Sequence, residues 1–187
     1  MNLTLYTERL ILTPLTPQDM PFLAEMRTDP LAMRYIGGVR TLKSVYENAD
    51  NYLRRSTDGH LGGWCVSDRE TGENLGTVRL RPMPIDEASD DWDEHNTSVD
   101  IDIGYLFKPA AWGKGYGTET VARVVQFCFQ DTAMPEIVAV VDEDNPASRH
   151  LLEKSGFRLE GPRKGYGKTM PGFRITRQMW LDQQNMP

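Results

Sequence analysis

The segment 112–119, WGKGYGTE, places three glycines at alternate positions immediately before a helix-like pattern. Because glycine has no side chain, the backbone N–H groups of such a turn can approach a ligand closely. The unpaired N–H groups at the start of the helix, and the positive end of its dipole, would add affinity for an anion. The segment therefore predicts a site for a phosphate or diphosphate group.

Three interpretations of this glycine segment stay open on its residues alone. A nucleotide-binding P-loop requires Ser or Thr after its GK pair, whereas Lys114 is followed by Gly115. A dinucleotide-binding fingerprint requires GxGxxG, and the spacing here is GxGxG. The third interpretation is an ordinary tight turn that binds no ligand.

A second group of polar residues lies in the segment 141–157, VDEDNPASRHLLEKSGF. Asn145 follows a predicted buried strand, and Pro146 is typical of the first position of a helix. Asn145 and Ser148 would therefore point into the gap beyond the end of that strand, beside the glycine turn if the two strands are neighbours. The structural alternative is that Asn145 caps the helix and Ser148 is a solvated residue of its first turn.

A third group is a pair of carboxylates on the predicted strand 98–107. Ile101 and Ile103 alternate with Asp100 and Asp102, which places the two carboxylates on the opposite face. A carboxylate in a substrate cleft can act as a general base and take a proton from an amine. The alternative is a pair of solvated carboxylates that only attract a cation.

Acidic residues are concentrated around this strand. Between Pro82 and Phe107 there are eight Asp and Glu residues and no Lys or Arg, in a chain of net charge −6. Such a patch suits a cationic partner and has the opposite sign to a nucleic-acid-binding surface. Residues 83–97 are interpreted as an acidic loop that either recruits this partner or is simply solvated.

Hydrophobic periodicity and turn residues predict the elements that position these groups. The predicted strands are 9–13, 64–67, 74–80, 98–107, 137–141, 157–160 and 173–181. The predicted helices begin near residues 17, 41, 117 and 146. This order predicts an α+β, or layered α/β, domain in which a mixed sheet carries helices on both faces.

The bulk composition is typical of a soluble globular protein. The 187 residues favour a single domain over 1–187, and the chain is 39% hydrophobic and 26% charged. No apolar run approaches the ~20 residues of a membrane span, and the first residues lack a signal-peptide pattern. Cys65 and Cys128 have no partners at metal-ligand spacing. We therefore expect a cytoplasmic protein with no metal site and no membrane or nucleic-acid partner.

Taken together, the motifs resemble the GNAT superfamily of N-acetyltransferases, and most closely its branch that includes the ribosomal-protein N-terminal acetyltransferases. Four segments carry the resemblance in order: TERLILTPLTPQD, WCVSDRETGENLGTVRL, DIGYLFKPAAWGKGYGTE and NPASRHLLEKSGFRLEG. The resemblance implies a mostly antiparallel sheet that is splayed at its middle, with acetyl-CoA in the cleft. It implies no metal.

The resemblance also implies the residues that bind the coenzyme. The backbone of Ile103 and Tyr105 would pair with the pantetheine arm, and Asn145 and Ser148 would hydrogen-bond that arm or approach the sulfur. The diphosphate would lie on the turn that is formed by Trp112, Gly113, Lys114, Gly115, Tyr116, Gly117 and Thr118. Trp112 stands where many relatives carry Gln or Arg.

The implied reaction is attack of a neutral primary amine on the thioester within a ternary complex. Asp102 is the candidate base, because it stands where relatives of this branch often carry Glu. Leu152 stands where many family members carry a tyrosine as general acid, so Ser148, Tyr105 or water would fill that role. The alternative is a regulatory module that binds acetyl-CoA without catalysis; a nucleotide hydrolase is disfavoured by the missing GK[ST].

The expected acceptor is a peptide N-terminus, a polyamine or an aminoglycoside. Trp92 would cover this substrate or pack the acidic loop down. Residues 163–172, RKGYGKTMPG, are expected to form a flexible lid near the acceptor. An exposed edge strand near the C-terminus would allow a homodimer.

Overall fold

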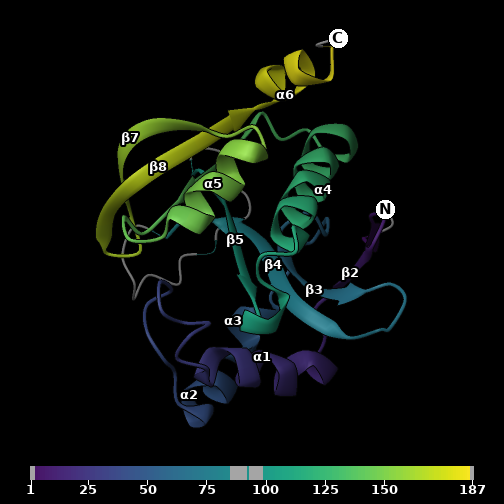
Figure 1. Ribbon diagram of the computed structural model, residues 1–187, viewed down its shortest axis with the longest axis vertical. Coiled ribbons are helices and arrows are strands. Elements are labelled where there is room, and N and C mark those ends of the chain that lie inside the picture. Colours follow the sequence, from purple (N-terminus) through teal and green to yellow (C-terminus); the bar gives the residue numbers. More distant parts are fainter. Residues whose placement is uncertain (1–2, 85–91, 93–98, 186–187) are drawn as a thin grey trace.

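The structure is a computed structural model that describes residues 3–84, 92 and 99–185. Most of the predicted acidic loop 83–97 therefore lies outside the described residues. Within them, eight strands form one sheet in the order β1-β2-β3-β4-β5-β6-β8-β7 (Figure 1). The strands are β1 (Leu5–Tyr6), β2 (Leu10–Pro14), β3 (Gly62–Asp68), β4 (Asn74–Pro82), β5 (Ile101–Phe107), β6 (Glu136–Val140), β7 (Arg158–Gly165) and β8 (Lys168–Thr176).

The helices are α1 (Met20–Thr28), α2 (Leu42–Glu47), α3 (Ala49–Leu53), α4 (Tyr116–Asp131), α5 (Pro146–Lys154) and α6 (Arg177–Gln184), with short 3-10 turns η1 (Pro17–Asp19) and η2 (Pro109–Ala111). The helices α1, α2, α4 and α5 lie near the places where helical spacing predicts them, whereas α6 was not predicted. No helix in the described part of the chain has the length and apolar character needed to cross a membrane.

The sheet is splayed between β5 and β6. Every other neighbouring pair of strands is antiparallel, whereas β5 and β6 are parallel and share a single register pair, Asp102 with Val138. A pair of strands joined at one position only must diverge on either side of it, which opens a gap in the middle of the sheet. The predicted fold, a mixed and mostly antiparallel sheet splayed at its middle, is confirmed.

Helices cover both faces of the sheet, and each face has its own apolar core. One core joins α1 and α2 to Leu106 of β5. The other joins α4 and α5 to Trp64 of β3 and to Ile103 and Phe107 of β5. Figure 1 shows α1–α3 gathered on one side of the strands and α4 and α5 on the other. Consecutive residues of β5 thus face different layers, as strand geometry requires.

Helix α4 fixes the position of the glycine turn that precedes it. Its residues Val121, Val124, Val125 and Cys128 are buried at i, i+3, i+4 and i+7, as the sequence predicts. The ring of Phe127 also packs edge-on against Trp64 at 5.8 Å. Burying one such aliphatic or aromatic side chain contributes about 1.5–3 kcal/mol, so α4 and its first turn are held firmly against the sheet.

The C-terminal part differs from the sequence prediction in two places. The strand predicted at 173–181 ends at Thr176, whose hydroxyl accepts a 3.2 Å hydrogen bond from the N–H of Met179 and so starts α6. The segment 163–172 is a β-hairpin and not an irregular loop, because its backbone pairs between β7 and β8, from Gly161 with Gly172 to Gly165 with Lys168; its expected role as a lid stays a prediction. Regular ladder hydrogen bonds hold this hairpin in place.

Candidate active site

The glycine turn has the backbone conformation that only glycine adopts easily. Gly113 and Gly115 have φ values of 73° and 82°, and Gly115 lies at the N-cap of α4. The first backbone hydrogen bond into the helix runs from the N–H of Glu119 to the carbonyl of Gly115, at 3.1 Å. The preceding N–H groups of the first helical turn have no intrahelical acceptor, which leaves them suited to an anion.

The third glycine of the turn has a packing role. A Cβ atom at Gly117 would lie 2.6 Å from a methyl group of Leu151 in α5. A side chain at this position would require Leu151 to move, so Gly117 gives the Leu151 side chain room to pack against the first turn of α4. The Trp112 indole also serves the local fold, since its Nε1 donates a 2.9 Å hydrogen bond to the carbonyl of Phe107 at the end of β5.

A charged clamp ties the glycine turn to the N-terminal strands, and the sequence analysis missed it. The carboxylate of Glu119 accepts hydrogen bonds from the Thr7 hydroxyl at 2.5 Å and from the Arg9 backbone N–H at 3.0 Å. The Arg9 guanidinium pairs with the same carboxylate at 2.6 Å and donates to the carbonyl of Lys114 at 3.0 Å. Its carbon lies 4.7 Å from the centre of the Tyr116 ring.

The gap at the splay is a cavity of about 420 Å³. It brings together, from separate segments of the chain, Asp102, Ile103, Tyr105, Asn145 and Ser148. These are five of the residues that the sequence analysis selects, and their proposed roles stay predictions. Residues 112–118 do not line the cavity, so the turn and the cavity are two separate parts of the site.

Asp102 is buried at the point where β5 and β6 meet. Its residue is only 3% exposed, and the Tyr166 hydroxyl donates a 2.6 Å hydrogen bond to its Oδ2. Burial raises the pKa of Asp102, and the hydrogen bond from Tyr166 and the positive charge of Arg79 oppose that rise in part. This burial contradicts the expectation of a solvated carboxylate shared with Asp100, which instead forms an ion pair with Arg163. The role of Asp102 as a base stays a prediction.

Tyr166 was not identified as a candidate from the sequence. It lies in the tight turn between β7 and β8 with a φ of 54°, and its N–H donates to the carbonyl of Pro84 at 2.9 Å. Its hydroxyl also accepts a 3.2 Å hydrogen bond from Arg79. The flanking glycines in KGYGK could have signalled a hairpin turn, but nothing local could have signalled the carboxylate that this turn meets.

Tyr105 and Ser148 form a second polar pair in the cavity. The Tyr105 hydroxyl and the Ser148 Oγ are 2.7 Å apart. Burial raises the pKa of Tyr105 above its ordinary value, so its hydroxyl stays protonated near neutral pH. The side-chain oxygen of Asn145 accepts a 3.0 Å hydrogen bond from the Ser148 N–H, so Asn145 caps α5 as the structural alternative supposed. Leu152 is fully buried in the apolar core.

The side of the cavity that faces α1–α3 is rich in arginine. Among the described lining residues, five are basic and two are acidic. The basic residues are Arg27, Arg40, Arg79, Arg81 and Lys168, and the acidic ones are Asp102 and Asp142. Arg79 and Arg81 enter from β4, where they stand beside Gly104 and Asp102 of β5. The described residues contain no cluster of acidic, His or Cys side chains that could hold a metal ion.

The sequence and fold comparisons agree with this geometry. The sequence profile of the family described as "Acetyltransferase (GNAT) domain" matches residues 9–158. The chain belongs to the GNAT acetyltransferase family. It is 27% identical over 164 residues to an uncharacterized N-acetyltransferase, YoaA, of Bacillus subtilis strain 168, with 87% of this chain and 86% of YoaA covered. As a family member, the chain is an acyltransferase of the N-acetyltransferase type.

Two solved structures share the fold. One is a spermidine N-acetyltransferase from Vibrio cholerae in complex with CoA and spermine, at a TM-score of 0.71 and 18% identity, covering 94% of this chain and 99% of the other. The second is the aminoglycoside acetyltransferase AAC(6')-Ib in complex with ribostamycin and coenzyme A, at a TM-score of 0.74 and 22% identity, covering 96% of this chain and all of the other.

Proposed function

We propose that this GNAT protein transfers an acetyl group from acetyl-CoA to a primary amine that enters the cavity at the splay. The single observation that carries the proposal is the meeting of a buried carboxylate, Asp102, with the Tyr105–Ser148 hydroxyl pair in one cavity. Relatives with this fold are solved with coenzyme A in complex.

The residues that are present fit acetyl-CoA. The turn at Gly113 and Gly115 presents backbone N–H groups at a helix N-terminus, which suits a diphosphate. The exposed edge of β5 at the splay offers Ile103 and Tyr105 as backbone partners for the pantetheine arm, because β6 pairs with β5 at one position only. When bound, acetyl-CoA supplies a thioester as the acetyl donor.

Asp102 would prepare the acceptor by taking a proton from its amine. An amine with an ordinary pKa near 10 is mostly protonated at neutral pH and is not a nucleophile in that form. A carboxylate whose pKa is raised by burial holds the proton better than a solvated one does. Tyr166 would act as a positioning residue, because its hydrogen bond fixes one oxygen of Asp102 and leaves the other for the amine.

The Tyr105–Ser148 pair would supply a proton to the departing thiolate of coenzyme A. The two hydroxyls are linked at 2.7 Å, so a proton that leaves Ser148 Oγ can be replaced from Tyr105 Oη. A thiol with a pKa near 8.5 is a fair leaving group, and a modest acid at this place is enough. In this assignment Tyr105 of β5 and Ser148 of α5 together act as the general acid, a role that Leu152 cannot fill.

The test is a coenzyme A release assay with a panel of primary amines, including peptides, polyamines, aminoglycosides and amino acids. We expect turnover with at least one class and its loss in Asp102→Asn. The alternative of a non-catalytic acetyl-CoA-binding module would be supported by tight coenzyme binding without transfer to any amine. The closer similarity to the ribosomal-protein N-terminal acetyltransferases stays a prediction. Acetylation of a protein N-terminus in this assay would support it.

A further inference from the structure

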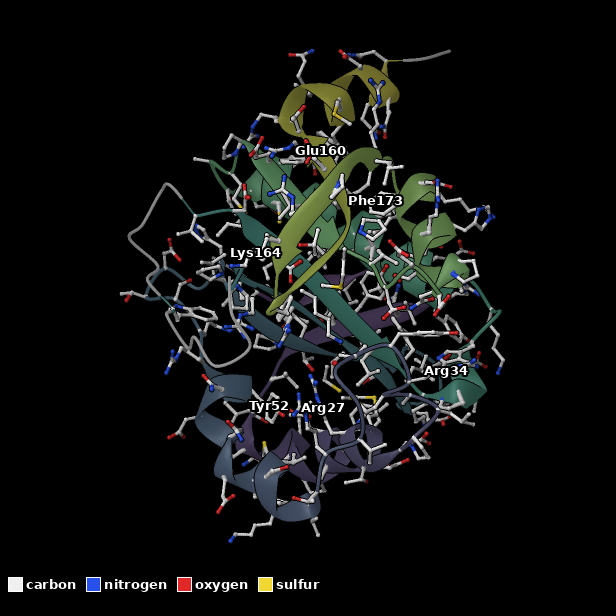
Figure 2. All side chains as sticks on the ribbon, turned by 90° about the vertical axis from the view of Figure 1, so that its left-hand side faces the viewer. Arg27, Arg34, Tyr52, Glu160, Lys164 and Phe173 are labelled. Carbon is white, nitrogen blue, oxygen red and sulfur yellow. The ribbon has the colours of Figure 1, made fainter. Side chains whose placement is uncertain are left out.

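Arg27 is a cation of the cavity that forms no ion pair with any described residue. It lies in the last turn of α1, and its Nε is buried without a hydrogen-bond partner among the described residues. Its guanidinium lies over the ring of Tyr52, 4.8 Å from the ring centre. Figure 2 shows Arg27 and Tyr52 beside each other between the helices and the sheet.

The surroundings of Arg27 disfavour its positive charge. Burial, followed by repulsion from Arg79 and Arg40, lowers the pKa of Arg27 to about 10. Burying a charge is costly unless it is paired, and the ring of Tyr52 offers only a weaker, partial compensation. A guanidinium retained under such conditions is well placed to receive an anion from outside the chain.

The two described carboxylates of the cavity are engaged elsewhere. Asp102 accepts the hydrogen bond from Tyr166, and an oxygen of Asp142 accepts a 3.0 Å hydrogen bond from the N–H of Asp144. No ion pair joins either of them to Arg27 among the described residues. The described cavity residues therefore include no carboxylate that neutralises the charge of Arg27.

We propose that the acceptor is a small primary amine that also carries a carboxylate or a phosphate, and that Arg27 binds this oxyanion. The inference rests on the proposed acetyl transfer and names its substrate class. The planar guanidinium matches a carboxylate or phosphate with two parallel hydrogen bonds. With the oxyanion at Arg27, the amine of the same molecule would face Asp102 across the cavity.

This assignment differs from the cationic acceptor that the acidic stretch of the sequence suggests. A polyamine or an aminoglycoside would bring further positive charge close to Arg27 and Arg79, at a cost in repulsion. The cavity of about 420 Å³ must also hold the end of the coenzyme, so it favours an acceptor of amino-acid size over a long chain.

Matched acceptors test the charge requirement directly. One set is leucine, leucinamide and isoamylamine; a second is phosphoethanolamine with ethanolamine; spermidine and kanamycin represent cationic acceptors. We expect kcat/KM for an anionic member to exceed that of its neutral partner by about 30-fold or more. The two sets show whether carboxylate or phosphate is preferred. The amine of leucinamide loses its proton more easily than that of leucine, so a preference for leucine cannot arise from amine reactivity.

Variants of Arg27 test the assignment to this residue. Arg27→Met keeps the aliphatic stem, and we expect it to raise KM for the anionic acceptor about 30-fold while kcat changes little. Arg27→Lys keeps the charge without the planar fork and should restore binding in part. Arg34→Met is the matched control: Arg34 is exposed, does not line the cavity and lies away from Arg27 in Figure 2. Thermal unfolding of each variant verifies that it folds.

Three outcomes overturn the inference. The first is acetylation of spermidine or kanamycin in preference to every anionic amine, which leaves the acetyl transfer standing. The second is weaker acetyl-CoA binding by Arg27→Met in calorimetry, which assigns the arginine to the coenzyme. The third is an unchanged KM of Arg27→Met for the anionic acceptor. If no amine is acetylated, the proposed function fails, and calorimetry of leucine and phosphoethanolamine on the coenzyme A complex still decides whether Arg27 binds an oxyanion.

Discussion

The hydroxyl of Tyr166 donates a 2.6 Å hydrogen bond to Oδ2 of Asp102, across 64 residues of sequence. The bond joins the β7–β8 turn to the middle of the splayed sheet, where β5 and β6 share their one register pair. It stabilises the ionised form of a carboxylate whose pKa is raised by burial. The base and its positioning residue are thus held by different parts of the fold.

Replacing Tyr166 by Phe removes that stabilisation, so the pKa of Asp102 should rise further. Since activity requires ionised Asp102, the limb of the kcat/KM profile that increases with pH should move to higher pH. Rates measured between pH 5 and 10 check this. Tyr46→Phe, at an exposed tyrosine outside the cavity lining, is the control. An unmoved profile in Tyr166→Phe would contradict the positioning role.

Asp102→Asn should lower kcat by about 100-fold, the scale of general base catalysis, and should remove the part of the rising limb that reports Asp102, leaving only the part due to the free amine. The acetyl-CoA dissociation constant should stay unchanged, because the coenzyme would contact the turn and the backbone of β5.

The same Asp102→Asn variant has a consequence for stability. The folded protein holds the Asp102 proton more tightly than the unfolded chain does, so wild-type stability falls as pH rises above the ordinary pKa of 3.8 toward the raised value. The variant lacks this loss. The free energy of unfolding of the variant minus that of wild type should therefore increase with pH over that window. Urea unfolding at several pH values measures this difference. A difference that decreases with pH would contradict a raised pKa of Asp102.

Gly115→Val should weaken acetyl-CoA binding by at least about tenfold, because a β-branched residue is strained at a φ of 82° and its side chain obstructs the backbone N–H groups. Gly72→Val is the matched control. Gly72 has a φ of 72° and open space around it in the β3–β4 turn, away from the site. Calorimetry that finds equal coenzyme affinity in both variants would remove the turn from the binding site.

Glu119→Gln should loosen the clamp on the glycine turn. Although burial opposes it, hydrogen bonds from Thr7 and Arg9 lower the pKa of Glu119 below 4.5. Stability from this pair is present above pH 4.5 and is lost as pH falls through the lowered pKa. We expect about 1 kcal/mol of destabilisation at pH 7, reduced by the exposure of Arg9. Denaturant unfolding at a series of pH values from 7 downward measures it, and a loss that stays constant over the whole series would refute the ionic origin.

Tyr105→Phe and Ser148→Ala should each lower kcat, by about tenfold, if the two hydroxyls deliver one proton in sequence. The double variant should then be no slower than the worse single variant, because residues that act as a unit are not additive. Single-turnover rates for the four proteins complete the cycle. Fully multiplicative losses would mean that the two hydroxyls act independently.

Much of the fold followed from short-range patterns. The buried face of α4, the asparagine cap of α5 and the left-handed glycines of the turn each depend on residues a few positions apart. The end of β8 was misplaced because residues 177–181 have no pattern that excludes a strand, whereas Thr176 caps a helix there. The paired hairpin at 163–172 was taken for a flexible segment because its glycines and prolines resemble those of a loop.

The sequence by itself determined the family, the glycine turn and the positions of Asp102, Tyr105 and Ser148, because these lie in contiguous motifs. Only the tertiary structure decided that Asp102 is buried, that Tyr166 is its hydrogen-bond partner and that Arg27 has no ion-pair partner among the described residues. Each of these depends on segments far apart in the chain that meet at the splay. The acidic stretch of the sequence predicts a cationic acceptor and the arginines among the described cavity residues favour an anionic one, because the side chains that line a cavity come from segments that are far apart in the chain.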